Sequence, residues 1–160
     1  MIDELKNIEY VLFDLDGTVS DSSEGITKSA DKALKSEGIN VPFETLTSFI
    51  GPALRVSFGR YTDDVEKRDR MLDVYRERYS EKGWCENKIY PGMAELLRDL
   101  QKSGKHVVLA SAKPEYFCRK IIKYFGVEQY FDFIGGSDME GKRDDKTVLL
   151  TYVLDNIGNP

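Results

Sequence analysis

The amino-acid sequence predicts an α/β fold, with a Rossmann-like parallel sheet as its core and a helical domain inserted after the first strand. Three short apolar runs, each ending in small or polar residues, have the pattern of buried parallel strands. Helical patterns with apolar stripes lie around the second and third runs. Residues 19–90 are too many for one crossover connection between the first two runs. The order of elements implies right-handed crossovers and a parallel sheet.

The predicted strands all end at residues suited to chemistry. The first strand is Tyr10–Phe13, and two aspartates follow it closely. The second is 105–110, which ends before Ser111, and the third is 131–134, which two glycines follow. Because open α/β sheets carry their sites at the carboxyl ends of the strands, we expect the site there.

Helices are predicted after Pro91, after Pro114 and near Asp145. Proline suits the first position of a helix, and Gly104 and Gly126 follow the first two patterns as stop signals. The third pattern places apolar residues on one face. Each helix would cover the sheet between or after its strands.

The long insertion has helical patterns of its own. Two helical patterns flank an apolar segment at 46–58. A structureless loop of this length is uncommon inside a compact domain. We therefore expect a helical cap at 19–85 and a core formed by 1–18 and 86–160.

Composition excludes several classes of protein. The 160 residues include 23 basic and 28 acidic side chains, a formal charge of −5, which disfavours a general nucleic-acid binder. No apolar run approaches the roughly 18 residues that cross a bilayer. The acidic residues within 1–10 do not fit a signal or transit peptide. Cys85 and Cys118 lie far apart and are expected to be free thiols, which favours a cytoplasmic protein.

Asp14 and Asp16 form the first candidate site. Two carboxylates at positions i and i+2 point the same way while the chain is extended. Burying them at a strand end is costly unless a cation or a developing charge needs them. Gly17 allows a sharp turn, Thr18 offers a hydroxyl and an amide, and oxygen ligands of this kind suit Mg²⁺. From the residues alone, an Asx-turn that merely ends the strand stays open as the alternative.

The segment Phe13–Thr18 resembles the first motif of haloacid-dehalogenase-type phosphohydrolases, and the helical insertion after it resembles their cap domain. Four further segments resemble the branch of phosphoglycolate phosphatases and 5′-nucleotidase-like proteins: Ser48–Arg55, Tyr90–Gly92, Ala110–Glu115, and Gly135–Asp138 continuing to Lys146. The resemblance covers nearly the whole chain.

This resemblance implies roles for the two aspartates. Asp14 would be the nucleophile that forms an aspartyl-phosphate. Asp16 would protonate the leaving oxygen and then deprotonate the attacking water. The side chain of Asp14 and the carbonyl of Asp16 would bind Mg²⁺ as the cofactor.

The resemblance also implies groups that bind phosphate. Ser111 would hydrogen-bond a phosphoryl oxygen, and Gly17 and Thr18 would contribute at the turn. Lys146, at the start of a helical pattern, would neutralise the phosphoryl charge, with Lys142 as the competing lysine. Without the resemblance, the serine fits a helix N-cap and both lysines fit a solvated surface.

One motif has a second interpretation. Gly136, Gly141 and Lys142 match the spacing of a phosphate-cradling P-loop. Arg143 stands where that loop needs Ser or Thr for Mg²⁺, and two acidic residues lie where phosphates would bind. A P-loop nucleotide-binding protein is therefore the weaker alternative.

The family's fourth motif, with its strand and acidic residues, would follow 157–160. We therefore expect an incomplete core in which the first strand is an open sheet edge. The predicted function is Mg²⁺-dependent phosphomonoester hydrolysis of a small metabolite such as 2-phosphoglycolate or a nucleoside monophosphate, with Arg55 of the cap as a specificity residue. The alternative is a shortened, weakly active or inactive binding or regulatory protein. A monomer or homodimer is expected, with no nucleic acid or membrane as partner.

Overall fold

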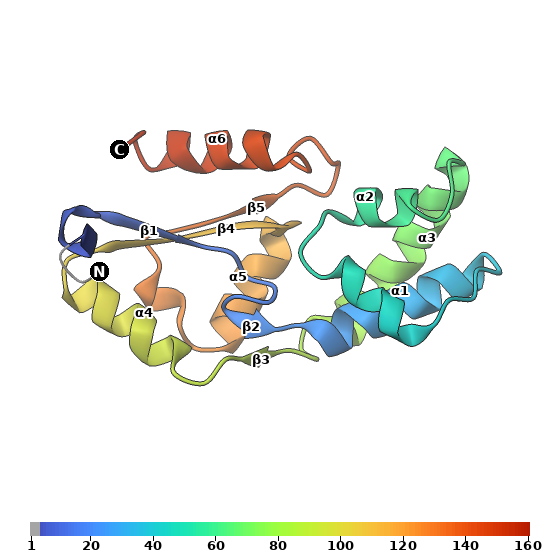
Figure 1. Ribbon diagram of the computed structural model, residues 1–160, viewed down its shortest axis with the longest axis horizontal. Coiled ribbons are helices and arrows are strands. Elements are labelled where there is room, and N and C mark those ends of the chain that lie inside the picture. The colour runs from blue at the N-terminus through green and yellow to red at the C-terminus, as the bar shows by residue number, and fades with distance from the viewer. Residues whose placement is uncertain (1–3) are drawn as a thin grey trace.

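The computed structural model describes residues 4–160 and confirms the predicted α/β class. A parallel sheet of three strands forms the core, in the order β1 (Tyr10–Phe13), β4 (His106–Pro114) and β5 (Phe133–Ser137). Helix α6 (Lys146–Asn156) covers one face, and α4 (Met93–Lys102) and α5 (Glu115–Tyr124) cover the other (Figure 1). The core is therefore a three-layer arrangement.

The burial of the central strand β4 explains why its apolar run predicted a strand. Val107, Val108 and Leu109 are each 0% exposed, because helices lie on both faces of the strand. The strand also continues four residues beyond the predicted end at 110, to Pro114. Ser111 pairs with Gly136 of β5, so backbone pairing extends into a segment that hydrophobicity alone does not mark.

The core helices begin close to where they were predicted. Pro114 caps α5, and the side chain of Asp145 caps α6 by accepting the backbone N–H groups of Thr147 and Val148 at 2.9 and 3.1 Å. Short 3₁₀ segments lie at Glu4–Asn7 and Glu128–Tyr130. No helix in the described part of the chain is long and apolar enough to cross a membrane.

The cap consists of helices that lie beside the sheet ends (Figure 1). They are α1 (Ser23–Ser36), the 3₁₀ helix η2 (Phe43–Phe49), α2 (Leu54–Gly59), α3 (Val65–Arg78) and the π-helical turn η3 (Tyr79–Gly83). A Cβ atom on Gly25 would lie 2.0 Å from the carbonyl oxygen of Gly83. Glycine at 25 therefore lets α1 and η3 pack backbone against backbone.

Two short strands connect the cap to the core. β2 (Ser20–Asp21) and β3 (Lys88–Ile89) pair in antiparallel fashion, with Ser20 opposite Ile89. The cap helices lie within the predicted insertion 19–85, and these strands span its two borders. The chain thus leaves and re-enters the core side by side.

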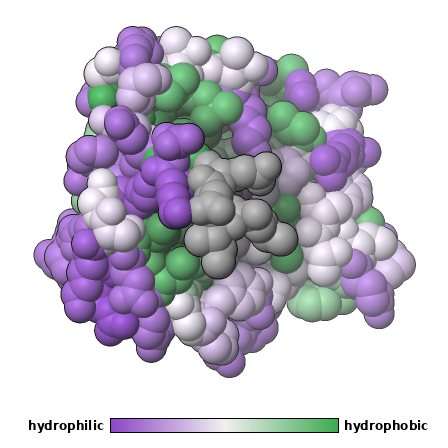
Figure 2. All heavy atoms as spheres, turned by 60° about the vertical axis from the view of Figure 1, so that its left-hand side comes forward, coloured by the Kyte–Doolittle hydropathy of each residue, from purple (hydrophilic) through white to green (hydrophobic). Residues whose placement is uncertain are grey.

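β1 is an edge strand of the described sheet. Beside it, Ile8, Leu12 and Leu154 expose 36–41% of their surface and help to line a shallow groove. Figure 2 shows this end of the molecule, where hydrophobic surface lies among hydrophilic side chains. An unpaired apolar edge of this kind can pair with another strand.

Candidate active site

The chain turns sharply as it leaves β1. Leu15 is fully buried, and its N–H donates to the Oδ1 atom of Asp14 at 2.7 Å. Gly17 has a φ of 78°, which favours glycine because other residues are strained there. The turn fixes Asp14 and Asp16 at the carboxyl end of the strand, as the sequence predicted.

Asp16 lies in a buried ion pair with Lys113. The Nζ atom of Lys113 is 3.2 Å from the Oδ2 atom of Asp16, and the two side chains are only 6% and 7% exposed. Lys113 Nζ also donates to the hydroxyl of Tyr79 in the cap at 2.8 Å. Burial alone would lower the pKa of Lys113, but Asp16 and the hydroxyls of Tyr79 and Tyr75 hold that pKa well above its ordinary value. The lysine is therefore a fixed positive charge.

Sequence reasoning gave Lys113 no role, although it lies in a segment that carried the family resemblance. One signal could have found it. Side chains alternate along a strand, so Ser111 and Lys113 share a side of β4 at its carboxyl end. Tyr79 of the cap, to which the sequence gave no part in the site, is 2% exposed, and its hydroxyl accepts a hydrogen bond from Lys113.

Ser111 is buried where the pairing of β4 and β5 becomes irregular. Its Oγ atom accepts the N–H of Lys113 at 3.3 Å. Opposite Ser111, a Cβ atom on Gly136 would lie 2.6 Å from the backbone of Lys113 and Glu115. Glycine at 136 is therefore needed for β5 to approach the segment that carries Ser111 and Lys113.

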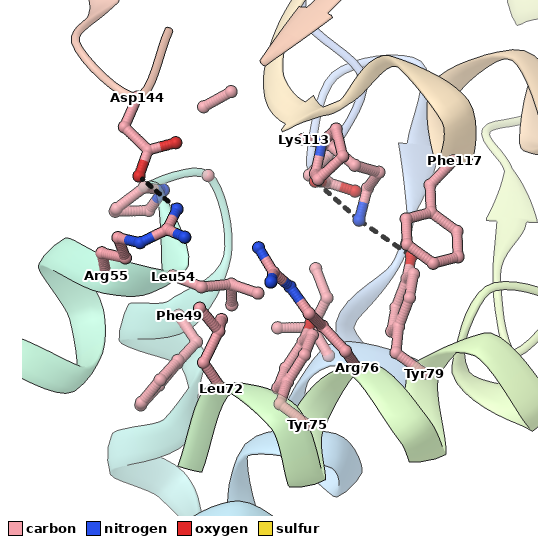
Figure 3. Close-up of a pocket in the computed structure, with 16 residues that line it drawn as sticks. Phe49, Leu54, Arg55, Leu72, Tyr75, Arg76, Tyr79, Lys113, Phe117 and Asp144 are labelled. Atoms are coloured by element: carbon pink, nitrogen blue, oxygen red, sulfur yellow. Dashed lines mark hydrogen bonds and ion pairs between the residues drawn. The ribbon is translucent and has the colours of Figure 1, made fainter. Parts of the chain in front are cut away.

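A cavity lies between the core and the cap (Figure 3). Asp16 and Lys113 line it from the core, and Arg55 and Arg76 line it from the cap. Apolar and aromatic side chains form most of the remaining wall: Phe49, Leu54, Leu72, Tyr75, Tyr79 and Phe117. The arrangement offers fixed charges at both ends and an apolar wall between them, as small-molecule sites commonly do.

Arg55, the predicted specificity residue, lines this cavity from α2. Its Nη1 atom is 3.3 Å from Oδ2 of Asp144, and its Nη2 atom donates to the carbonyl of Met139 at 3.2 Å. Arg55 thus reaches across from the cap to a loop of the core.

Arg76 was not predicted from the sequence. It follows Leu72 by four residues and precedes Tyr79 by three, so it lies on the apolar face of α3. An arginine that interrupts an apolar helical stripe was the available signal.

Gly17 and Thr18 do not line the cavity, and their amides are used within the turn. The N–H of Gly17 donates to the carbonyl of Ser20 at 2.9 Å, and the N–H of Thr18 donates to that of Leu15 at 3.2 Å. Their predicted part in phosphate binding would require these bonds to rearrange.

The two predicted lysines lie outside this cavity. Lys146 is exposed in the first turn of α6, and Lys142 is exposed and paired with Glu140. Asp14 and Ser111 also lie outside the residues that line the cavity, although both are at the same sheet edge as Asp16. The structure therefore brings Asp16, Lys113 and Arg55 to one space.

The loop after β5 argues against the P-loop alternative. The carboxylate of Asp138 accepts the backbone N–H groups of Glu140, Lys142 and Arg143 at 2.8, 3.0 and 2.8 Å. A P-loop binds phosphates with such amides. Here a carboxylate of the protein occupies them.

The donor set around Asp14 and Asp16 suits a hard cation such as Mg²⁺, because it consists of oxygen atoms. The Oδ1 atom of Asp16 is buried and has no hydrogen-bond partner among residues 4–160. Within the same residues, no three His, Cys, Asp or Glu side chains gather to hold a metal ion. The two aspartates therefore fit part of a magnesium shell.

Comparison with known proteins gives the family. A model of the haloacid dehalogenase-like hydrolases matches residues 11–157. The chain is 39% identical to a 5′-nucleotidase of Pseudomonas aeruginosa over 92% of this chain and 68% of that protein. It is 36% identical to tyrosine-protein kinase PtkA of Mycobacterium tuberculosis over 91% of this chain. It spans only half the length of that relative.

A further relative is a phosphoglycolate phosphatase of Aquifex aeolicus, 30% identical over 94% of this chain and 71% of that protein. Among solved structures, a predicted phosphatase from Clostridium acetobutylicum superposes with a TM-score of 0.91 at 40% identity. That comparison covers 94% of this chain and 71% of the other.

Proposed function

Because this chain belongs to the haloacid dehalogenase-like hydrolases, we propose that it hydrolyses small phosphomonoesters with Mg²⁺ through an aspartyl-phosphate on Asp14. The family, together with the 5′-nucleotidase and the phosphoglycolate phosphatase among the relatives, makes it a phosphatase; the metal, the covalent intermediate and the substrate are our proposal. One observation carries the proposal: Asp14 and Asp16 follow directly after β1, and the fixed positive charge of Lys113 lies 3.2 Å from Asp16.

In this mechanism Asp14 and Asp16 act in two steps. A carboxylate oxygen of Asp14 bonds to phosphorus while the bond to the leaving oxygen breaks, and Asp16 gives that oxygen its proton. Water then attacks the same phosphorus, the bond to Asp14 breaks, and Asp16 takes a proton from the water. The products are an alcohol and inorganic phosphate, and both carboxyl groups return to their first state.

Three further groups would support these steps. Lys113 offers a fixed charge to the phosphoryl oxygens, and Ser111 and Lys146 remain candidates for the same task. The Asp14 carboxylate and the Asp16 carbonyl would hold Mg²⁺, which would offset repulsion between carboxylate and phosphate. The proton that Asp16 gives and takes would lie on its Oδ1 atom, which has no hydrogen-bond partner among residues 4–160, while Oδ2 stays in contact with Lys113.

The relatives' names support 2-phosphoglycolate or a nucleoside monophosphate as substrate. We also propose that the protein acts as a monomer or homodimer in the cytoplasm, with this metabolite as its partner and with neither nucleic acid nor membrane.

Asp14→Asn tests the nucleophile. Phosphate release from p-nitrophenyl phosphate, 2-phosphoglycolate and AMP is measured with Mg²⁺ present. We expect the variant to lose activity by about 1,000-fold or more, because an amide cannot form the intermediate. Acid-quenched wild-type protein should carry one added phosphoryl group by intact mass. Asp99→Asn, on the exposed face of α4, is the matched control. Retention of more than a tenth of the activity in Asp14→Asn would refute the proposal.

The small number of acidic metal ligands favours the alternative that the protein is weakly active or inactive. With two aspartates, we expect Mg²⁺ to bind the chain with a dissociation constant on the order of 1 mM or weaker, because most of its shell would be water. Calorimetric titration of wild type and Asp14→Asn measures this. Tight binding by the wild type that Asp14→Asn abolishes would show a complete site and remove the alternative.

A further inference from the structure

Two arginines of the cap face the cavity. Arg55 comes from α2 and Arg76 from α3, and both line the space that Asp16 and Lys113 line from the core. In Figure 3 the guanidinium of Arg76 points into the space between the Arg55–Asp144 pair and Lys113. The two cationic groups therefore stand opposite the proposed reacting end.

Their hydrogen bonding is incomplete. Nη2 of Arg76 donates to the carbonyl of Met139 at 2.7 Å, and Nη2 of Arg55 donates to the same carbonyl at 3.2 Å. The Nε atom of Arg76 is buried and has no partner among residues 4–160. A buried donor without an acceptor is costly and uncommon in a native protein. Within the described part of the chain, the site therefore lacks an acceptor for the Nε atom of Arg76.

Their charge is also unmatched. Asp144 faces Arg55 at 3.3 Å and is the one carboxylate among the described residues that lines this cap end of the cavity. Burial, together with the charge of Arg55, lowers the pKa of Arg76. Arginine still keeps its proton in proteins, so both charges persist. Two guanidinium groups thus line this end of the cavity with one carboxylate, and that carboxylate is paired with Arg55.

Two other arginines of the cap, Arg70 and Arg78, are each fully paired with a carboxylate. Arg70 binds both carboxylate oxygens of Glu37 at 2.8 and 3.0 Å. Arg78 binds both oxygens of Glu86 at 2.9 and 3.1 Å. Each has a bidentate carboxylate, the geometry that the guanidinium fork favours. Arg76 has no such partner, although it lies on the same helix.

We propose that Arg76, together with Arg55, binds a second anionic group, a carboxylate or a phosphate, at the end of the substrate opposite the phosphomonoester. This inference rests on the proposed function, because it takes Asp14 and Asp16 as the reacting end. The apolar wall of Phe49, Leu54 and Leu72 would contact the carbon skeleton between the two anions. Such a site selects 2-phosphoglycolate over AMP, which has no second anion.

A matched pair of ligands tests this inference. 2-Phosphoglycolate and ethyl phosphate differ by a carboxylate against a methyl group. Their dissociation constants are measured by calorimetry in Asp14→Asn, which prevents turnover. We expect the preference for 2-phosphoglycolate to fall about 10- to 100-fold when Arg76→Met is added, the range for a lost hydrogen bond to a charged group. Arg55→Met should reduce it in the same direction.

Arg70→Met, on the exposed side of α3, is the control and should leave the preference within about threefold. Thermal melting checks that each variant folds. Ethylene glycol bisphosphate, which carries a second phosphate in place of the carboxylate, tests which anion the site prefers. Arg76→Met should weaken the binding of the preferred ligand more than that of the other. An unchanged preference in folded Arg76→Met and Arg55→Met overturns the inference.

The two proposals can fail separately. If p-nitrophenyl phosphate is not hydrolysed but the binding preference depends on Arg76, the proposed function fails and the anion site stands. If p-nitrophenyl phosphate is hydrolysed and the binding preference depends on neither arginine, only the proposed anion site fails.

Discussion

The core side and the cap side of the cavity differ in how their charged side chains are paired. On the core side, Lys113 and Asp16 form a one-to-one ion pair that is almost fully buried. On the cap side, Arg55 pairs with Asp144, and Arg55 and Arg76 both donate to the backbone carbonyl of Met139. The core thus holds a matched pair of charges, whereas the cap holds, among the described residues, a buried donor without an acceptor, the Nε atom of Arg76. We infer that the fold orients the chemistry and leaves recognition to be completed by a ligand.

The same groups also join the two regions. Polar contacts across the cavity run from Tyr79 to Lys113, from Arg55 to Asp144 and from Arg76 to the carbonyl of Met139. A ligand that binds the arginines would compete with the last two contacts. The contact of Tyr79 with Lys113 does not involve these arginines.

Breaking the core pair should have the largest effect on stability. Lys113→Met leaves the Asp16 carboxylate buried without its partner, and this costs about 3–5 kcal/mol in comparable buried pairs. We expect a loss of that size in the free energy of unfolding, measured with urea by circular dichroism.

A double variant sharpens this test. Adding Asp16→Asn to Lys113→Met removes the remaining charge, so part of the lost stability should return. Lys35→Met removes a partner from the exposed pair with Asp31 and should have a far smaller effect. Equal losses for Lys113→Met and Lys35→Met would contradict the contrast between a matched core and an open cap.

Much of the fold could be predicted because burial leaves a pattern in the sequence. Tyr10–Phe13 is the strand that the apolar run indicated, and α6 begins directly after the predicted cap at Asp145. The end of β4 could not be placed, since Ser111 to Pro114 pair with a glycine-rich strand and not through apolar contacts. The packing of Gly25 on Gly83 also could not be predicted, because a close contact between two backbones leaves no periodic pattern of apolar residues in the sequence.

The candidate site was predicted where the chain itself brings residues together. Asp14 and Asp16 are neighbours in sequence and end the same strand. Lys113 and Arg76 become neighbours of Asp16 and Arg55 only through the folding of cap on core, so no local pattern pairs them. The charge of a lysine also says nothing about its burial, which is why Lys146 and Lys142 were considered from the sequence and Lys113 was given no role.

The smallest expected effect concerns the loop that supplies the cap arginines with acceptors. Burial would raise the pKa of Asp138, but backbone N–H groups of residues 140–143 outweigh it and lower that pKa below its ordinary 3.8. The Nε atom of Arg143 lies 4.0 Å from the Oδ2 atom of Asp138. The folded pKa is lowered, so the stabilisation is fully present above pH 3.8 and is lost as pH falls through the lowered value. Asp138→Asn should cost no more than about 1 kcal/mol at pH 6, because the amide oxygen can still accept the N–H groups of Glu140 and Lys142 and only the bond from Arg143 is lost.

Urea unfolding of wild type and Asp138→Asn between pH 2.5 and 6, on the order of half-unit steps, measures this difference. The advantage of the wild type should be constant near neutrality and should shrink in the most acidic samples. Glu140→Gln removes a charge from the same loop whose partner is the exposed side chain of Lys142, and it should not reproduce that pH dependence. If the advantage of the wild type instead grew as pH fell, Asp138 would not be the group that orders the loop. The contact of Met139 with both arginines would then need another support from the core.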